Sequence, residues 1–141
     1  MELTKKLSIL IIDDDKEIRE SFQRILERQE YKVSIAADGD EGLTLCKEID
    51  IDVALTDIAM PNMDGLEFLR LVHHYSPKTE VIMMTGQSTV ERCVKAIEYG
   101  AAAYLIKPAS IIDILNCISE AAKKLKAKDA MLEKAIHHSK K

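Results

Sequence analysis

The chain lacks long hydrophobic runs. None of its apolar stretches approaches the ~18 residues that a membrane-spanning helix needs, so no membrane span is expected. The apolar stretch at residues 6–12 is too short for a signal peptide, and three aspartates follow it where a cleavage site would have small residues. We therefore expect a buried strand here and a cytoplasmic protein.

The chain also has few cysteines and no glycine-rich phosphate-binding loop. Its three cysteines, Cys46, Cys93 and Cys117, are an odd number, lie far apart and form no CxxC motif. Disulfides and a cysteine metal site are therefore not expected, and the thiols are predicted to be reduced and mostly buried. The missing glycine-rich loop argues against nucleotide binding of the P-loop kind.

Charge is unevenly distributed along the chain. The 141 residues carry a net charge of −4. Residues 123–141 contain seven lysines against Asp129 and Glu133, a balance of +5, which leaves −9 for residues 1–122. An acidic body does not favour nucleic acids, so no direct nucleic-acid binding is expected from this segment.

Short apolar segments alternate strictly with segments of helical periodicity. This alternation predicts an α/β fold in which helices cover both faces of a parallel sheet. A capping box formed by Ser110 and Asp113 predicts the start of a last helix. We expect one domain at residues 1–122 and an extension of the last helix, or linker, at 123–141. The predicted strands are 6–12, 31–37, 52–56, 80–85 and 102–106, and the other helices are 16–29, 39–48, 66–75 and 88–99.

Polar residues follow four of the predicted strands. Each one alone has an ordinary explanation, because an aspartate after a strand is usually a turn or helix cap and a lysine is usually solvated. Parallel strands, however, bring their carboxyl ends to one edge, where ligands of open α/β sheets bind. The residues concerned are Asp13, Asp14 and Asp15, then Asp57, Thr85 and Lys107.

Together these side chains suit phosphoryl transfer. Converging carboxylates repel one another and need a cation, and hard oxygen ligands favour Mg²⁺. A carboxylate beside the metal can attack phosphorus, while a lysine ammonium and a threonine hydroxyl hold the remaining phosphoryl oxygens. Such a reaction needs little beyond positioning and charge neutralisation.

Four segments of the sequence resemble the motifs of response-regulator receiver domains in two-component signalling. They are ILIIDDDKEIRE, LTDIAMPNMDGLEFL, VIMMTG and AAAYLIKP, and the resemblance covers about residues 5–122. It implies a flavodoxin-like (βα)5 doubly wound sheet with strand order 2-1-3-4-5, like that of chemotaxis regulators. It further implies that a sensor histidine kinase transfers a phosphoryl group to Asp57.

The resemblance also implies roles for the neighbouring residues. Asp14 would bind Mg²⁺ directly and Asp13 through water, with the backbone carbonyl of Ala59 and the carboxylate of Asp57 as further ligands. Asp15 is expected to lie outside the metal shell, as the cap of the helix that starts near residue 16. The remaining implied roles are Thr85 as the switch hydroxyl, Tyr104 as the aromatic switch, Lys107 as the family's site lysine, and Lys107-Pro108 as a cis peptide bond.

Tyr104 also has a simpler interpretation, as a half-buried ring on an edge strand. The switch interpretation predicts two rotamers of Tyr104 that follow the occupancy of Asp57, and a change at the surface of the fourth helix, fifth strand and fifth helix. Ala59 and Gln87 occupy positions that vary in the family and tune the lifetime of the phosphoryl group. Because Ala59 offers no group to hold an attacking water, we expect slow self-dephosphorylation.

The last helix continues beyond the usual end of a receiver. Apolar residues follow a four-three spacing from Ile111 to Ile136, interrupted by Asp129, which is typical of a coiled-coil seam. The helix could pair with a second copy, giving a homodimer, or lead into an output domain as in regulators with a downstream ATPase domain. Alternatively, its first half packs on the sheet and the rest frays. The seam candidates are Ile118, Leu125, Leu132 and Ile136.

Other functions fit the sequence less well. A haloacid-dehalogenase-type phosphatase would have its nucleophile in a DxD motif after the first strand, and a flavodoxin would need a Ser/Thr/Gly-rich loop there. A degenerate receiver, acting as an interaction module without phosphorylation, is the alternative we keep. Otherwise we expect a signalling domain and not an enzyme, with an output domain or separate protein downstream. The four histidines, His73, His74, His137 and His138, are expected to be solvated.

Overall fold

The computed structural model describes residues 6–60, 62–86 and 89–139. Within this part, five strands alternate with five helices, as the periodicity predicts. Observed boundaries differ from the predicted ones by one or two residues at several ends. The elements are β1 (Ser8–Ile12), α1 (Lys16–Arg28), β2 (Lys32–Ala36), α2 (Gly39–Glu48), β3 (Val53–Asp57), α3 (Gly65–Tyr75), β4 (Glu80–Thr85), α4 (Val90–Glu98), β5 (Ala103–Ile106) and α5 (Ile111–Ser139).

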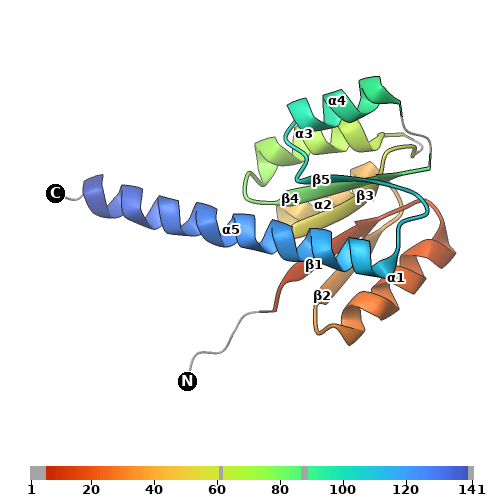
Figure 1. Cartoon of the computed structure of the whole chain (residues 1–141), viewed down its shortest axis with the longest axis horizontal. Helices are drawn as coiled ribbons and strands as arrows, with labels where there is room; N and C mark the ends of the chain where they lie inside the picture. Colours follow the sequence, from red (N-terminus) through yellow and green to blue (C-terminus); the bar gives the residue numbers. More distant parts are fainter. Residues whose placement is uncertain (1–5, 61, 87–88, 140–141) are drawn as a thin grey trace.

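The five strands form one parallel sheet in the order β2-β1-β3-β4-β5, which confirms the predicted topology. All residues of β1, β3 and β4 are buried. Strands with no polar face are expected where helices cover both sides of a parallel sheet. Figure 1 shows this layered arrangement, with α5 running along the sheet and extending well beyond it.

Two apolar clusters fill the spaces between the sheet and its helices. One includes Leu10, Ala54, Val81 and Met83 and packs against α2, α3 and α4. The other includes Ile9, Leu55, Ile82 and Met84 and packs against α1 and α5. Successive strand residues therefore point to opposite clusters, which fixes the register of each strand.

The cysteines are free, as expected. Cys46 is buried on α2, and burial raises the pKa of its thiol to about 11. Cys93 and Cys117 are partly buried. Burial also raises the pKa of Cys117, with smaller contributions from Asp113 and Glu120. A thiol that stays protonated at neutral pH is a poor nucleophile, which agrees with a packing role.

Short polar residues cap the helices and set where they begin. Thr89 accepts a hydrogen bond from the backbone N–H of Arg92, so α4 begins at Val90 and not at the predicted residue 88. The hydroxyl of Ser110 accepts from the N–H of Asp113 at 3.1 Å, which places a cap at the predicted start of α5. After α4, Gly100 has φ +90°, a conformation that favours glycine, and this confirms the predicted helix end.

The first half of the longest helix, α5, packs on the sheet, which agrees with one of the two predicted alternatives and corrects two of the seam candidates. Its inward face carries Ile114, Ile118, Ala121 and Leu125, all buried in the core. Ile118 and Leu125 therefore pack against the chain's own sheet and are not available to a second copy. Only two of the four seam candidates, Leu132 and Ile136, are exposed. No helix within the described ranges is long and apolar enough to cross a membrane.

Candidate functional site

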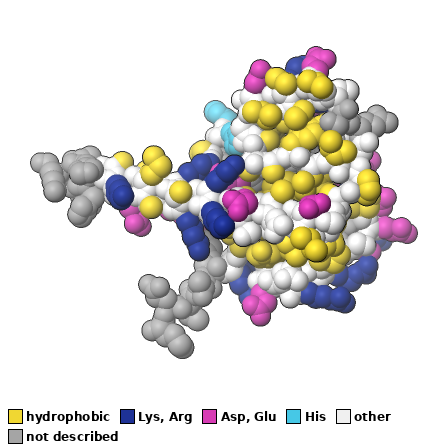
Figure 2. All heavy atoms as spheres, viewed as in Figure 1, with side chains coloured by type: hydrophobic (Ala, Val, Ile, Leu, Met, Phe, Trp, Pro, Cys, Tyr) yellow, Lys and Arg dark blue, Asp and Glu magenta, His cyan; other side chains and the backbone are white. Residues whose placement is uncertain are grey.

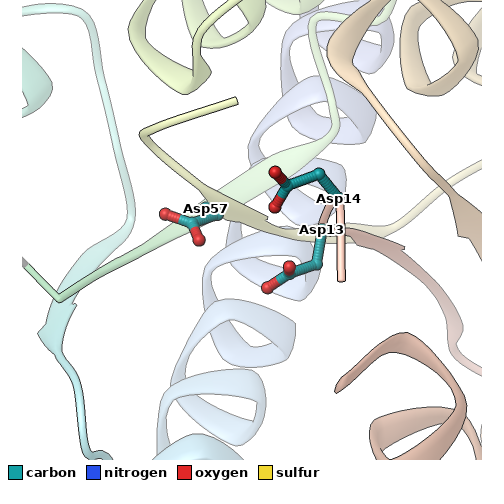
Figure 3. A group of neighbouring side chains, drawn as sticks. All are labelled: Asp13, Asp14 and Asp57. Atoms are coloured by element: carbon teal, nitrogen blue, oxygen red, sulfur yellow. The ribbon is translucent and has the colours of Figure 1, made fainter. Parts of the chain in front are cut away.

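The carboxyl ends of β1, β3, β4 and β5 bring the predicted site residues to one edge of the sheet. Asp57 and Thr85 are the last residues of β3 and β4, while Asp13 directly follows β1 and Lys107 directly follows β5. Figure 3 shows Asp13 and Asp14 extending from the end of β1 toward Asp57. The predicted convergence is thus confirmed for residues that lie up to 94 positions apart.

Three carboxylates form the centre of this site. Asp13, Asp14 and Asp57 each offer an oxygen atom, and these atoms lie within 4.8 Å of one another. Asp13 is only 2% exposed, Asp57 is 9% exposed and Asp14 is open to solvent. An all-oxygen set with one open side fits a hard divalent cation that keeps several water ligands, as Mg²⁺ does.

Lys107 contacts two of these carboxylates. Its Nζ lies 2.8 Å from Oδ2 of Asp57 and 3.4 Å from Oδ2 of Asp13. Desolvation alone would lower the pKa of Lys107, but the hydrogen bond to Asp57 and the charge of Asp13 outweigh it, so the pKa is raised. The three carboxylates of the cluster thus carry more negative charge than this one ammonium group offsets.

Asp13 is the most buried of the three carboxylates. Burial raises the pKa of its carboxyl group, and the charge of Asp57 adds to this. The backbone N–H of Asp15 and the ammonium of Lys107 act in the opposite direction without cancelling the effect. A group whose charged form is disfavoured in the folded protein is stabilised by a nearby cation.

The backbone after β1 holds Asp13 in place. The N–H of Asp15 donates to Oδ1 of Asp13 at 2.9 Å, and Arg19 Nη1 donates to the Asp13 carbonyl at 2.7 Å. The carboxylate of Asp15 accepts from the N–H of Glu17 and caps α1. Asp15 is therefore the predicted cap and is not part of the acidic cluster. The contact from Arg19 was not predicted, because an arginine one turn into a helix usually points to solvent.

The loop after β3 fits closely around Asp57. The N–H of Ala59 donates to Oδ1 of Asp57 at 3.2 Å, and the N–H of Gly65 donates to the carbonyl of Ile58 at 2.8 Å. A Cβ atom at Gly65 would lie 2.4 Å from the Asp57 carbonyl oxygen, so only glycine fits there. The sequence identified the Asp64-Gly65 pair as a turn signal but did not indicate this close approach.

Thr85 and Tyr104 lie on neighbouring strands. Thr85 is 1% exposed, and its carbonyl accepts from the N–H of Lys107 at 2.7 Å. Tyr104 pairs with Met83 across the strands and packs beside the cluster that faces α2, α3 and α4. Its hydroxyl is buried with no hydrogen-bond partner among the described residues. The peptide bond between Lys107 and Pro108 is cis, as expected.

Some predicted roles stay predictions. Ala59 lies in the loop directly after Asp57, where its carbonyl could reach the metal site, but its role as a ligand is not tested. Gln87 lies outside the described residues. His73 is partly buried beside Gly100, whereas His74 is exposed; the side chains of His137 and His138 also lie outside the described part.

Comparison with known proteins identifies the family. A model of the response regulator receiver domain matches residues 9–119, which include the described site residues. The chain belongs to this family. Its receiver fold resembles that of a CheY-like receiver domain protein from Methanospirillum hungatei, with a TM-score of 0.85 and 37% identity, covering 88% of this chain and 99% of the other.

Two further relatives place the receiver in context. The regulatory protein AtoC of Escherichia coli is 36% identical over 92% of this chain, which spans only 27% of AtoC. A response regulator from Burkholderia pseudomallei, solved with a phosphorylated aspartic acid and a calcium ion, has a TM-score of 0.77 and 28% identity. That match covers 89% of this chain and 74% of the other. The present chain thus spans about a quarter of AtoC.

Proposed function

We propose that this receiver domain accepts a phosphoryl group on Asp57 from the phosphohistidine of a sensor histidine kinase. The observation that carries the proposal is the position of the Asp57 carboxylate, which lies 2.8 Å from Lys107 and within reach of the Asp13 and Asp14 oxygens. A phosphoryl group has several charged oxygens that need such neighbours. The Burkholderia relative, with its phosphorylated aspartic acid, supports the same chemistry.

The transfer itself needs one nucleophile and a charged surrounding. An oxygen of Asp57 attacks phosphorus, the bond between phosphorus and the histidine nitrogen breaks, and the imidazole leaves with the electron pair. Asp13, Asp14, Asp57 and the carbonyl of Ala59 would hold Mg²⁺, which screens the phosphoryl oxygens when bound. Lys107 already contacts Asp57 and would stabilise the charge that develops on the phosphoryl group.

We further propose that Thr85 and Tyr104 change conformation when Asp57 is phosphorylated and transmit this change to the surface. Thr85 would move toward the new phosphoryl oxygens, and Tyr104 would turn with it because its buried hydroxyl has no described partner. The surface affected comprises α4, β5 and α5, where exposed apolar residues offer a contact area for an output domain or a separate protein. These residues are Val90, Val94, Ile97, Ile106 and Ile112.

Partners beyond the kinase are proposals of the same kind. Because the chain spans about a quarter of AtoC, an output domain in further chain would be one source of the response. A homodimer through α5 would use Leu132 and Ile136, since Ile118 and Leu125 are buried. We propose a cytoplasmic location, which suits the free cysteines, and a signalling role in which the domain promotes only its own phosphorylation and dephosphorylation.

The central experiment is phosphorylation by a small donor. The protein is incubated with acetyl phosphate and Mg²⁺, and its intact mass is measured. We expect one added phosphoryl group, absent in Asp57→Asn and absent when a chelator removes Mg²⁺. Asp15→Asn is the matched control, because asparagine caps a helix as well as aspartate does. An unmodified protein under these conditions would favour the alternative of an interaction module that works without phosphorylation.

A further inference from the structure

A buried carboxylate lies at the end of the sheet opposite the phosphorylation site. Glu80 is the first residue of β4, and its side chain is only 5% exposed. Along β4, Ile82 and Met84 face α1 and α5, whereas Val81 and Met83 face the other helices. Glu80 shares the side of Ile82 and Met84, so it occupies a position where the core would otherwise have an apolar side chain.

Lys128 of α5 meets this carboxylate. Its Nζ lies 2.5 Å from Oε1 of Glu80, and its side chain is 53% exposed. The inward row of α5 ends in the core at Leu125, and Lys128 comes one turn later on the same side. The pair therefore continues the packing of α5 on the sheet, with an ion pair in place of an apolar contact.

Two weaker contacts surround the pair. Lys78 lies 3.3 Å from Asp129, and Lys124 Nζ donates to the Ala102 carbonyl at 3.3 Å. Both lie at the surface, where such contacts add little stability. Figure 2 shows basic side chains gathered where α5 leaves the body and hydrophobic side chains further out. The Glu80–Lys128 pair is the most buried of these contacts, so we expect it to contribute most to stability.

We propose that the Glu80–Lys128 pair makes α5 as far as Asp129 part of the folded receiver and fixes the direction in which the helix leaves it. The buried carboxylate of Glu80 needs a cation, and the ammonium group of Lys128 supplies it. Residues 130–139, called here the C-terminal segment, then begin immediately after a fixed point. Their exposed apolar residues, Met131, Leu132 and Ile136, are presented in one direction to whatever follows or pairs with them. The proposal rests on these contacts and not on the phosphorylation chemistry.

The test compares single lysine replacements in the full 141-residue chain. Lys128→Met leaves the Glu80 charge buried and unpaired, so we expect Tm to fall by about 3–10 °C. Backbone amides of residues 126–136 should exchange hydrogen about tenfold faster or more, because the helix loses its anchor. Lys126→Met, on an exposed lysine of the same helix, should change neither quantity. Lys128→Arg keeps the charge and should restore most of the protection.

A double variant separates pairing from a general loss of stability. Glu80→Gln removes the charge that Lys128 neutralises, so the double variant E80Q/K128M should be less destabilised than the sum of its two single changes. If K128M alone does not fold, a folded double variant supports the pair, and an unfolded one overturns it. Equal Tm and equal amide exchange in K128M and K126M would also overturn the proposal.

Discussion

The two ends of the sheet treat buried charge in opposite ways. At the carboxyl end, three carboxylates lie together and one lysine, Lys107, contacts two of them. The hydroxyl of Tyr104, on β5, has no described partner. At the amino end, Glu80 forms an ion pair with Lys128, and the carboxylate of Asp52 accepts from the N–H of Ser8 at 2.8 Å. The carboxyl end therefore has a group of carboxylates that could bind an added cation, whereas the buried carboxylate at the amino end already contacts a lysine.

This difference distinguishes a ligand-binding site from an ion pair that only stabilises the fold. Buried polar groups normally find partners during folding, because leaving one unpaired costs stability. An excess of one charge is therefore expected where a bound ligand compensates it. A lysine–carboxylate pair alone therefore does not identify a functional site in this protein. An excess of carboxylates over lysines, as at the carboxyl end, is the more informative signal.

Removing the excess charge gives the largest expected effect. The double variant D13N/D14N should be phosphorylated by acetyl phosphate at least about a hundred times more slowly, because it loses two of the groups that would hold the cation. In the presence of a chelator the same variant should be more stable than the unmodified protein, since like charges no longer repel. Intact-mass time courses and thermal unfolding measure the two effects.

Asp15→Asn serves as control for the double variant, because it changes a neighbouring aspartate outside the cluster. The direction in which the Asp13 charge changes the free energy of unfolding follows from the raised pKa of its carboxyl group. Folding then favours the protonated carboxyl group, so the destabilisation is absent at low pH and appears as pH rises through the folded-state pKa. A loss of stability in D13N/D14N with chelator present would contradict the contrast between the two ends.

Adding Mg²⁺ gives the next effect in size. A ligand present at a hundred times its dissociation constant stabilises the folded state by about 2.7 kcal/mol. Thermal unfolding of the unmodified protein should therefore shift upward with Mg²⁺, while D13N/D14N should not respond. K128M, altered at the amino end, should respond as fully as the unmodified protein does. Sodium chloride of equal ionic strength controls for general screening.

Tyr104→Phe gives the smallest effect. The substitution removes a buried hydroxyl that has no described partner, so the free energy of unfolding should rise by about 1 kcal/mol. Phosphorylation of Asp57 should continue, because Tyr104 holds no phosphoryl oxygen. Denaturant unfolding measures the change, with Tyr99→Phe, a partly buried tyrosine, as the matched control. A clear loss of stability in Y104F would mean that the hydroxyl is paired.

The sequence was sufficient for the architecture and for most of the site. Strand ends could be located from apolar segments, and parallel strands must share an edge, so Asp13, Asp57 and Lys107 could be brought together without coordinates. Asp15 could be assigned as a cap because it directly precedes a helical segment. The strand order and the cis bond came from the family resemblance and not from the pattern of residues.

Periodicity could not decide between the two interpretations of α5. A helix that packs on its own sheet and a helix that pairs with a second copy both repeat apolar residues every three or four positions. Ile118 and Leu125 therefore fitted the predicted seam equally well, although they lie in the core. Glu80 at the start of an apolar strand was the signal that could have indicated packing of α5 on the sheet, since a buried carboxylate requires a cation nearby. The close approach of Gly65 to Asp57 depends on tertiary packing and could not be predicted locally.

The extension of α5 beyond Asp129 has a mechanical consequence. A helix rises about 1.5 Å per residue, so the ten residues from 130 to 139 form a lever of about 15 Å. A tilt of about 10° at its base would displace its far end by about 3 Å, larger than most shifts inside a packed core. Small rearrangements of the sheet would thus be magnified at the far end of the helix.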